Sequence, residues 1–241
     1  MNNKPERNSL QNAIAVLCAF MMCLSVLASP AFALKAHAEP NDYQPPLALK
    51  TLWEQNHHVI GGLFIPGTAV CYPILQHPSI DDYYLNVCLD GTEGLPGSIY
   101  TNKVEGQNFN TFNTVIYGHN MRDGSYFGSL RLFRDPDYLS DHREIYVFGA
   151  DAMHIYEIFA VVIYTDERIT DYFPDELVEY RMAFLQSLQS DSLEDSILLT
   201  DVPVDPNNGH ILTLSTCITD MPNNRLLIVA AERHSNDFKK I

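Results

Sequence analysis

Short apolar runs, each closed by a polar or turn-forming residue, recur along most of this chain and limit the folds open to it. The 14 prolines and 12 glycines of the sequence fall mainly between these runs. Runs of this length favour β-strands over the longer helices of a bundle, so we expect a mainly β fold closed into a barrel of eight strands. The candidate strands are residues 59–65, 69–75, 97–101, 111–117, 144–149, 154–164, 197–199, 211–217 and 225–232.

Three segments instead predict helices. Residues 48–57 form a short helix at the start of the barrel, and residues 124–133 form another after the fourth strand. The clearest helix is predicted at 174–188, inserted late in the chain, with Pro174 and two acidic residues in its first turn. Its buried face is predicted to carry Leu177, Phe184, Leu185 and Leu188.

The N-terminus differs from the rest of the chain. Lys4 and Arg7 precede an apolar stretch at residues 13–28, which small residues follow, as in an export signal. Read through to residue 34, the stretch is also long enough for a single membrane anchor. We therefore expect a signal or anchor at residues 1–34, a linker at residues 35–48 and an extracytoplasmic domain at residues 49–241, with cleavage and secretion as the alternative to anchoring.

The overall charge and the absence of several motifs narrow the possible partners. A formal net charge of −15 would repel phosphate backbones, so nucleic acid is not expected as a partner. The sequence has no His-Glu-x-x-His, no Cys-x-x-Cys and no glycine-rich phosphate loop. His57 and His58 are adjacent strand residues that would point to opposite faces. No metal and no cofactor are therefore expected.

Beyond the signal, the chain has an odd number of cysteines, namely Cys71, Cys88 and Cys217. At least one thiol is therefore unpaired, which is unusual in an exported protein and indicates a catalytic thiol. We expect Cys71 and Cys88 to be ordinary buried thiols within strands. A disulfide between these two is the alternative.

Cys217 stands at the end of one predicted strand, and Arg225 begins the next. His119 follows the end of a third strand, at residues 111–117. A thiol can act as a nucleophile, a histidine as its acid and base, and a guanidinium can hold a substrate carbonyl or a developing oxyanion. Because a barrel gathers side chains from its strand ends, these three residue types predict a cysteine-based acyl transferase.

These motifs resemble those of sortases, the cysteine transpeptidases of Gram-positive cell walls. Thr213-Leu214-Ser215-Thr216-Cys217 with Arg225 resembles the sortase signature, and Ile116-Tyr117-Gly118-His119 resembles its histidine motif. Three further sequence blocks and one helix resemble those of class B sortases and occur in the same order along the chain, namely residues 65–68, 83–86 and 97–100 and the helix at 174–188. The chain departs from the class at Gly62, at residues 101–103 and at Ile218, which puts substrate preference, not chemistry, in question.

The resemblance implies a sortase-like barrel and a thioacyl mechanism. Cys217 attacks a carbonyl in the C-terminal sorting motif of a surface protein, His119 protonates the departing amine and then accepts a proton from a peptidoglycan amine, and Arg225 orients the carbonyl. Further residues that the resemblance assigns to substrate binding are Ser215, Thr216, Tyr117 and Asn86. The implied partners are surface proteins, peptidoglycan and, through the N-terminal segment, the membrane.

Two other functions remain open at the level of the sequence. A cysteine endopeptidase would use the same thiol chemistry with water as the acceptor. A non-catalytic surface-binding domain would keep the scaffold without the reaction.

Overall fold

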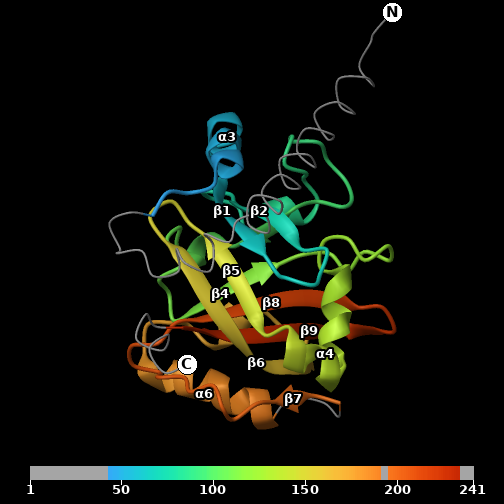
Figure 1. Cartoon of the computed structure of the whole chain (residues 1–241), viewed down its shortest axis with the longest axis vertical. Helices are drawn as coiled ribbons and strands as arrows, with labels where there is room; N and C mark the ends of the chain where they lie inside the picture. Colours follow the sequence, from blue (N-terminus) through green and yellow to red (C-terminus); the bar gives the residue numbers. More distant parts are fainter. Residues whose placement is uncertain (1–42, 191–194, 234–241) are drawn as a thin grey trace, which may run out of the picture.

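A computed structural model describes residues 43–190 and 195–233 of the 241-residue chain. Its core is one mixed sheet that closes on itself (Figure 1). The strands are β1 (Val59–Phe64), β2 (Cys71–Gln76), β3 (Ile99–Thr101), β4 (Asn113–Tyr117), β5 (Glu144–Phe148), β6 (Met153–Thr165), β7 (Ile197–Leu198), β8 (Ile211–Ile218) and β9 (Met221–Glu232).

The strand order is β5-β1-β2-β3-β4-β8-β9-β6-β7, and an additional pairing of β5 with β6 closes the ring. Eight strands therefore form the barrel, as predicted, while β7 adds to β6 at Ala160 and Val161 beyond the end of β5. The pairs β2–β3 and β4–β8 are parallel, and the other pairs are antiparallel. The β4–β8 pair matters most for function, because it sets segments about a hundred residues apart side by side.

The strands are apolar on both faces because both faces of the barrel wall are covered. In β9, Leu226 and Ile228 belong to the cluster that fills the barrel, while Leu227 and Val229 belong to a second cluster outside it. This alternation is the period of two that a strand imposes. It also explains why these strands read in the sequence as continuous apolar runs rather than as alternating ones.

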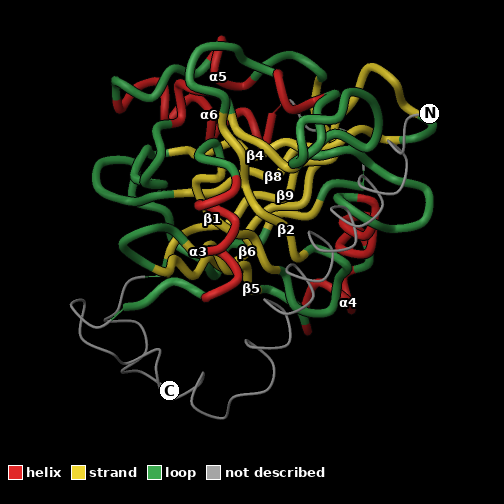
Figure 2. The backbone as a smooth tube through the Cα atoms, turned by 90° about the horizontal axis from the view of Figure 1, so that it is seen from above, coloured by secondary structure: helices red, strands yellow, loops and turns green. Residues whose placement is uncertain are grey.

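Helices cover the barrel on two sides. Helix α3 (Leu47–Gln55) buries Leu49 and Leu52 against the outer side of β1, β2 and β3, and Figures 1 and 2 place it over one end of the barrel. Helix α6 (Val178–Ser190) buries Phe184 and Leu188 in the second outer cluster, on the side of β6 and β9. The prediction of a helix at the start of the barrel and a second one inserted before the last strands is confirmed.

The beginning of the inserted helix was predicted wrongly. We expected it at residue 174, but α6 begins at Val178. The side chain of Asp175 accepts a hydrogen bond of 2.6 Å from the backbone N–H of Phe112, and its carbonyl accepts one of 2.9 Å from Arg181 Nε. These contacts hold residues 174–177 as a turn against the start of β4, and Leu177, expected on the buried face, is 53% exposed.

The helix predicted at 124–133 is also shorter than expected. Gly124 and Tyr126 adopt positive φ angles of 87° and 51°, which a right-handed helix excludes. A 3₁₀ helix, η3 (Gly128–Arg134), forms only after them and leads into α4 (Pro136–Asp141). The remaining short elements are η1 (Tyr83–Leu85), η2 (Lys103–Glu105) and α5 (Ile169–Tyr172).

The cysteines of the described residues form no disulfide with one another. Cys71 is buried in β2, as expected. Cys88 is half-buried in a loop rather than in the strand that we predicted. In this loop the Cys88 N–H donates to the Thr92 carbonyl, next to an isolated antiparallel bridge between Val87 and Glu93 that is not part of a longer strand.

The predicted anchor at residues 1–34 and most of the linker at residues 35–48 lie outside the described residues. Within residues 43–190 and 195–233, no helix has the length and apolar character needed to cross a bilayer. The structure therefore corrects the prediction of a single N-terminal membrane anchor, which has no support in it.

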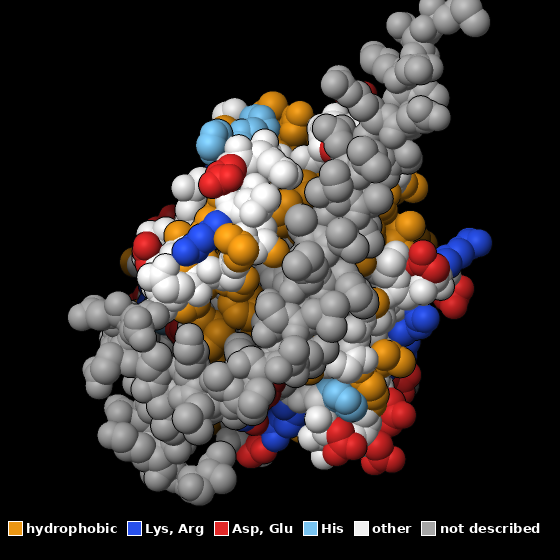
Figure 3. Space-filling model, turned by 45° about the horizontal axis from the view of Figure 1, so that its top comes forward, with side chains coloured by type: hydrophobic (Ala, Val, Ile, Leu, Met, Phe, Trp, Pro, Cys, Tyr) orange, Lys and Arg blue, Asp and Glu red, His pale blue; other side chains and the backbone are white. Residues whose placement is uncertain are grey.

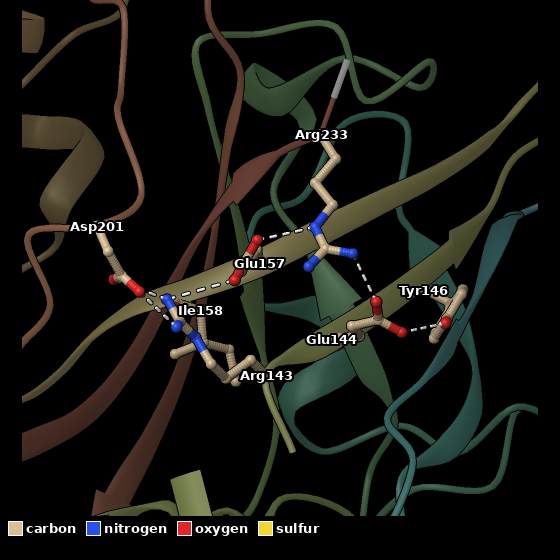
Figure 4. A network of polar contacts seen from close by, with 7 residues as sticks. All are labelled: Arg143, Glu144, Tyr146, Glu157, Ile158, Asp201 and Arg233. Atoms are coloured by element: carbon tan, nitrogen blue, oxygen red, sulfur yellow. Dashed lines mark hydrogen bonds and ion pairs between the residues drawn. The ribbon is translucent and has the colours of Figure 1, made fainter. Parts of the chain in front are cut away.

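Charged side chains fasten the barrel where it closes. Arg233, just after β9, donates to Glu157 on β6 at 2.8 Å and to Glu144 on β5 at 2.6 Å (Figure 4). Arg143 reaches both oxygens of Asp201 at 2.7 and 2.9 Å. On the face shown in Figure 3, the Lys and Arg side chains are scattered singly rather than gathered into one patch.

Candidate active site

Strands β4, β8 and β9 present their outward-facing residues to one pocket of about 350 Å³ on the outer side of the barrel wall. In β8, Leu212 and Leu214 point into the barrel, so Cys217 shares the outer face with Ile211. The same alternation puts Arg225 on the outer face with Leu227. Both residues line the pocket, as does His119, which follows β4.

Cys217 and Arg225 are direct partners across the antiparallel ladder of β8 and β9, so their side chains leave the sheet next to each other. The Arg225 guanidinium donates through Nη1 to the carbonyls of Pro222 at 3.1 Å and Asn224 at 3.0 Å. Its Nη2 lies 4.0 Å from the carboxylate of Asp166. The guanidinium is thus held beside an exposed thiol.

The ring of His119 is oriented by a hydrogen bond of 2.7 Å between Nε2 and the carbonyl oxygen of Leu85. Because a carbonyl oxygen only accepts, Nε2 carries a proton in this contact. The next residue, Asn120, donates from Nδ2 to the carbonyl of Cys217 at 2.9 Å. The segment that carries His119 and the segment that carries Cys217 are therefore joined through the backbone of Cys217.

Two stacked tyrosines support the pocket. The rings of Tyr100 and Tyr117 lie 5.4 Å apart at an interplanar angle of 25°, because the two residues are partners in the β3–β4 ladder. Burial raises the pKa of both phenols above the ordinary value, and for Tyr117 the carboxyl of Glu105 acts in the same direction. Both therefore remain neutral and serve as apolar, flat surfaces near neutral pH.

The residues predicted to bind substrate are placed differently from one another. Tyr117, Ser215 and Thr216 line the pocket. The hydroxyl of Thr216, however, is buried and donates to the carbonyl of Gly118 at 2.7 Å. Asn86 does not line the pocket, while its neighbour Leu85 does.

Sequence reasoning missed the loop between β6 and α5. Residues 165–169 of this loop line the pocket, together with Asp82 from the turn before η1. Arg168 forms an ion pair with Asp82, whose other oxygen accepts a hydrogen bond of 3.0 Å from the Tyr100 hydroxyl. No periodic pattern marks such a loop. The only available signal was its run of charged residues, Asp166-Glu167-Arg168.

A family model for the sortase domain matches residues 63–234, which include every residue that lines this pocket. The chain belongs to the sortase family. Within the described residues, no cluster of histidine, cysteine and acidic side chains has the geometry of a metal site. The pocket offers a thiol, an imidazole and a guanidinium, the groups that a cysteine transpeptidase uses.

The relatives of this sortase are of class B. It is 33% identical over 172 residues to sortase B of Listeria monocytogenes, covering 71% of this chain and 68% of that protein. The solved sortase B of B. anthracis is 30% identical, with a TM-score of 0.65, covering 79% of this chain and 86% of that one. A Staphylococcus aureus sortase B–substrate complex shares the fold, with a TM-score of 0.72 at 20% identity, covering 95% and 98%. The expected class and fold are confirmed.

Proposed function

We propose that residues 49–241 form a catalytic domain that cleaves a C-terminal sorting motif of surface proteins and transfers the acyl group to an amine of cell-wall peptidoglycan. The observation that carries the proposal is that Cys217, Arg225 and His119 line one pocket, with Cys217 and Arg225 as direct cross-strand partners. A solved structure of the same fold is described as a sortase B–substrate complex, which supports the proposal that this fold binds a substrate.

In the first half of the reaction, His119 takes the thiol proton of Cys217, and the thiolate Sγ attacks the carbonyl carbon of the scissile peptide bond. The carbonyl oxygen becomes an oxyanion, which the free N–H donors of Arg225 stabilise. The C–N bond then breaks, and His119 gives a proton to the departing amine. The product is a thioester between Cys217 and the N-terminal part of the substrate.

In the second half, the amine of the acceptor attacks the thioester carbon while His119 accepts its proton. The C–S bond breaks, the new amide leaves, and the thiol and imidazole return to their starting states. The stacked rings of Tyr100 and Tyr117 provide an apolar surface against which the peptide packs. Ser215, Thr216 and Asn86 remain predicted substrate contacts, with Thr216 acting through its backbone because its hydroxyl is occupied.

The direct test measures both halves of the reaction with the full chain. A library of fluorogenic pentapeptides is screened with and without a peptidoglycan stem peptide that carries a free amine. We expect a ligated product, a thioester adduct of Cys217 seen by mass spectrometry, and loss of both in Cys217→Ala. Arg225→Lys should lower kcat/KM at least about 100-fold, because a point charge does not replace the fork of donors.

Cys88→Ala is the matched control, since that half-buried thiol does not line the pocket and its loss should leave activity unchanged. Cleavage with no ligated product at any amine concentration would show an endopeptidase that uses water. Absence of any thioester adduct with all peptides would show a binding domain without catalysis and would overturn the proposal.

A further inference from the structure

The ring of His119 takes its orientation from η1, a short turn in the connection between β2 and β3. Its Nε2 contacts the carbonyl oxygen of Leu85, the last residue of η1, at 2.7 Å. Leu85 is 37% exposed, and of the three residues of η1 Tyr84 alone is buried. The position of the Leu85 carbonyl therefore depends on how this turn is held against the barrel.

One side of η1 is held by the residues just before β3. The Ser98 N–H donates to the Tyr84 carbonyl at 2.9 Å. The Leu85 carbonyl lies so close to Gly97 that a Cβ there would be 2.3 Å from its oxygen. These contacts fix the backbone of η1 from one side, and they leave the side chains of its two tyrosines to be held by other groups.

Two histidines contact those tyrosine side chains. His58 stands just before β1 and His77 just after β2, and the Gln76 N–H joins the two strand ends by donating to the His58 carbonyl at 2.8 Å. The His58 Nδ1 lies 2.7 Å from the Tyr84 hydroxyl. The His58 and His77 rings meet edge to face with centroids 5.1 Å apart, and the His77 ring lies 4.3 Å from that of Tyr83. Both tyrosines are thus held from the ends of two paired strands.

The histidines make these contacts as neutral rings. The Nδ1 of His77 accepts hydrogen bonds from the backbone N–H groups of Ser79 at 3.2 Å and Ile80 at 2.9 Å, so this nitrogen carries no proton. These two bonds close the turn that leads into η1. Burial lowers the pKa of His58, and positive charge on His77 or His57 acts in the same direction. His58 therefore meets the tyrosine hydroxyl uncharged near neutral pH.

We propose that His58 and His77 are positioning residues for the reaction, which hold η1 so that the Leu85 carbonyl keeps the His119 ring in one orientation. The inference rests on the proposed function, since the imidazole that they orient is the proposed acid and base. It assigns the control of this ring to two side chains that do not line the pocket. Because proton transfer depends on geometry, a loosened ring should slow the chemical steps more than it weakens peptide binding.

The first test removes these contacts one at a time and measures cleavage of a peptide substrate. Tyr84→Phe and His58→Phe remove the two sides of one contact, so each should lower kcat about fivefold with KM nearly unchanged, and the double variant should lose no more. His77→Phe keeps a ring but loses the acceptor and should lower kcat by a similar factor. His77→Asn restores an acceptor that closes the same turn and should recover most of this loss. Tyr83→Phe is the matched control, since it keeps the ring beside His77, and should not change kcat.

The second test needs no cleaved peptide. Nitrogen NMR of the His119 imidazole is recorded at about pH 9 in the Cys217→Ala background, so that the ring is neutral and has no thiolate partner. Nε2 should carry the proton when η1 is intact, because the Leu85 oxygen accepts from it. Adding Tyr84→Phe or His77→Phe should produce a mixture of the two tautomers. Thermal unfolding confirms that each variant is folded.

An unchanged His119 spectrum in both folded variants would overturn the inference, whether or not kcat falls, because the ring would then keep its orientation without these contacts. An altered spectrum with unchanged kcat would overturn it as well, because the orientation would not matter for the reaction. If the wild-type chain cleaves no peptide while the spectrum responds as expected, the proposed function fails and the coupling of the two histidines to the His119 ring stands.

Discussion

A buried carboxyl beneath β4 predicts that this protein loses stability as the pH rises from 5 to 8. Glu105, the last residue of η2, is 2% exposed. Its Oε2 accepts a hydrogen bond of 3.1 Å from the Val115 N–H of β4, and its Oε1 has no hydrogen-bond partner among the described residues. Burial raises the pKa of this carboxyl from an ordinary 4.5 to about 8, and the negative charges of Asp175 and Asp81 add to the shift.

The direction in which stability changes with pH follows from proton binding. Between pH 5 and pH 8 the folded protein keeps the proton on Glu105, while the unfolded chain releases it. The raised pKa therefore contributes stability that is fully present below the unfolded pKa and is lost as the pH rises through the folded value. With pKa values of 4.5 and about 8, the loss between pH 5 and pH 8 is on the order of 3 to 4 kcal/mol. Glu105→Gln has no proton to release and should not show this loss.

The assay is urea unfolding at several pH values between 5 and 8, followed by the fluorescence of Trp53, the single tryptophan. The free energy of unfolding of wild type minus that of Glu105→Gln should fall steadily across this range. Other titrating groups cancel in the difference, and Glu54→Gln, an exposed glutamate on α3, should run parallel to wild type. If wild type and Glu105→Gln also run parallel, the carboxyl is already ionised in the folded protein and the reasoning is refuted.

Two further substitutions test the supports of the site and of the barrel. Gly97 has a φ of 62°, and a Cβ there would lie 2.3 Å from the Leu85 carbonyl oxygen that orients His119. Gly97→Ala should therefore lower kcat/KM about tenfold. Gly91→Ala is the control and should not lower kcat/KM, because Gly91 also has a positive φ but a Cβ there would meet open space. Equal activity of the two variants would show that the Leu85 contact is dispensable. Arg233→Met removes the guanidinium that pairs with Glu144 and Glu157 (Figure 4). It should lower the free energy of unfolding, measured by urea titration at low salt, by about 1–2 kcal/mol. An unchanged urea midpoint would mean that these partly exposed ion pairs contribute nothing to stability.

The strands were predictable because each carries its own signal. The apolar runs at residues 59–65, 144–149 and 211–217 correspond to β1, β5 and β8 within one or two residues, since apolar β-rich runs bounded by turn residues need no tertiary information to be recognised. The ends of helices were less predictable. The start of α6 moved from residue 174 to Val178 because Asp175 bonds to Phe112, a contact that lies 63 residues away and leaves no local trace.

The sequence alone established the residue types of a thiol-based site, their attachment to strand ends and, by resemblance, the family of the chain. Tertiary structure decided which face of the barrel carries that site: the strand alternation turns Cys217 and Arg225 outward, and the parallel pairing of β4 with β8 brings His119 to them. It also decided the wall of the pocket, where Arg168 meets Asp82. A local sequence pattern predicts which side chains a strand carries. Which of these side chains come into contact depends on the register between distant strands and on the path of the loops, because such contacts join residues far apart in the sequence.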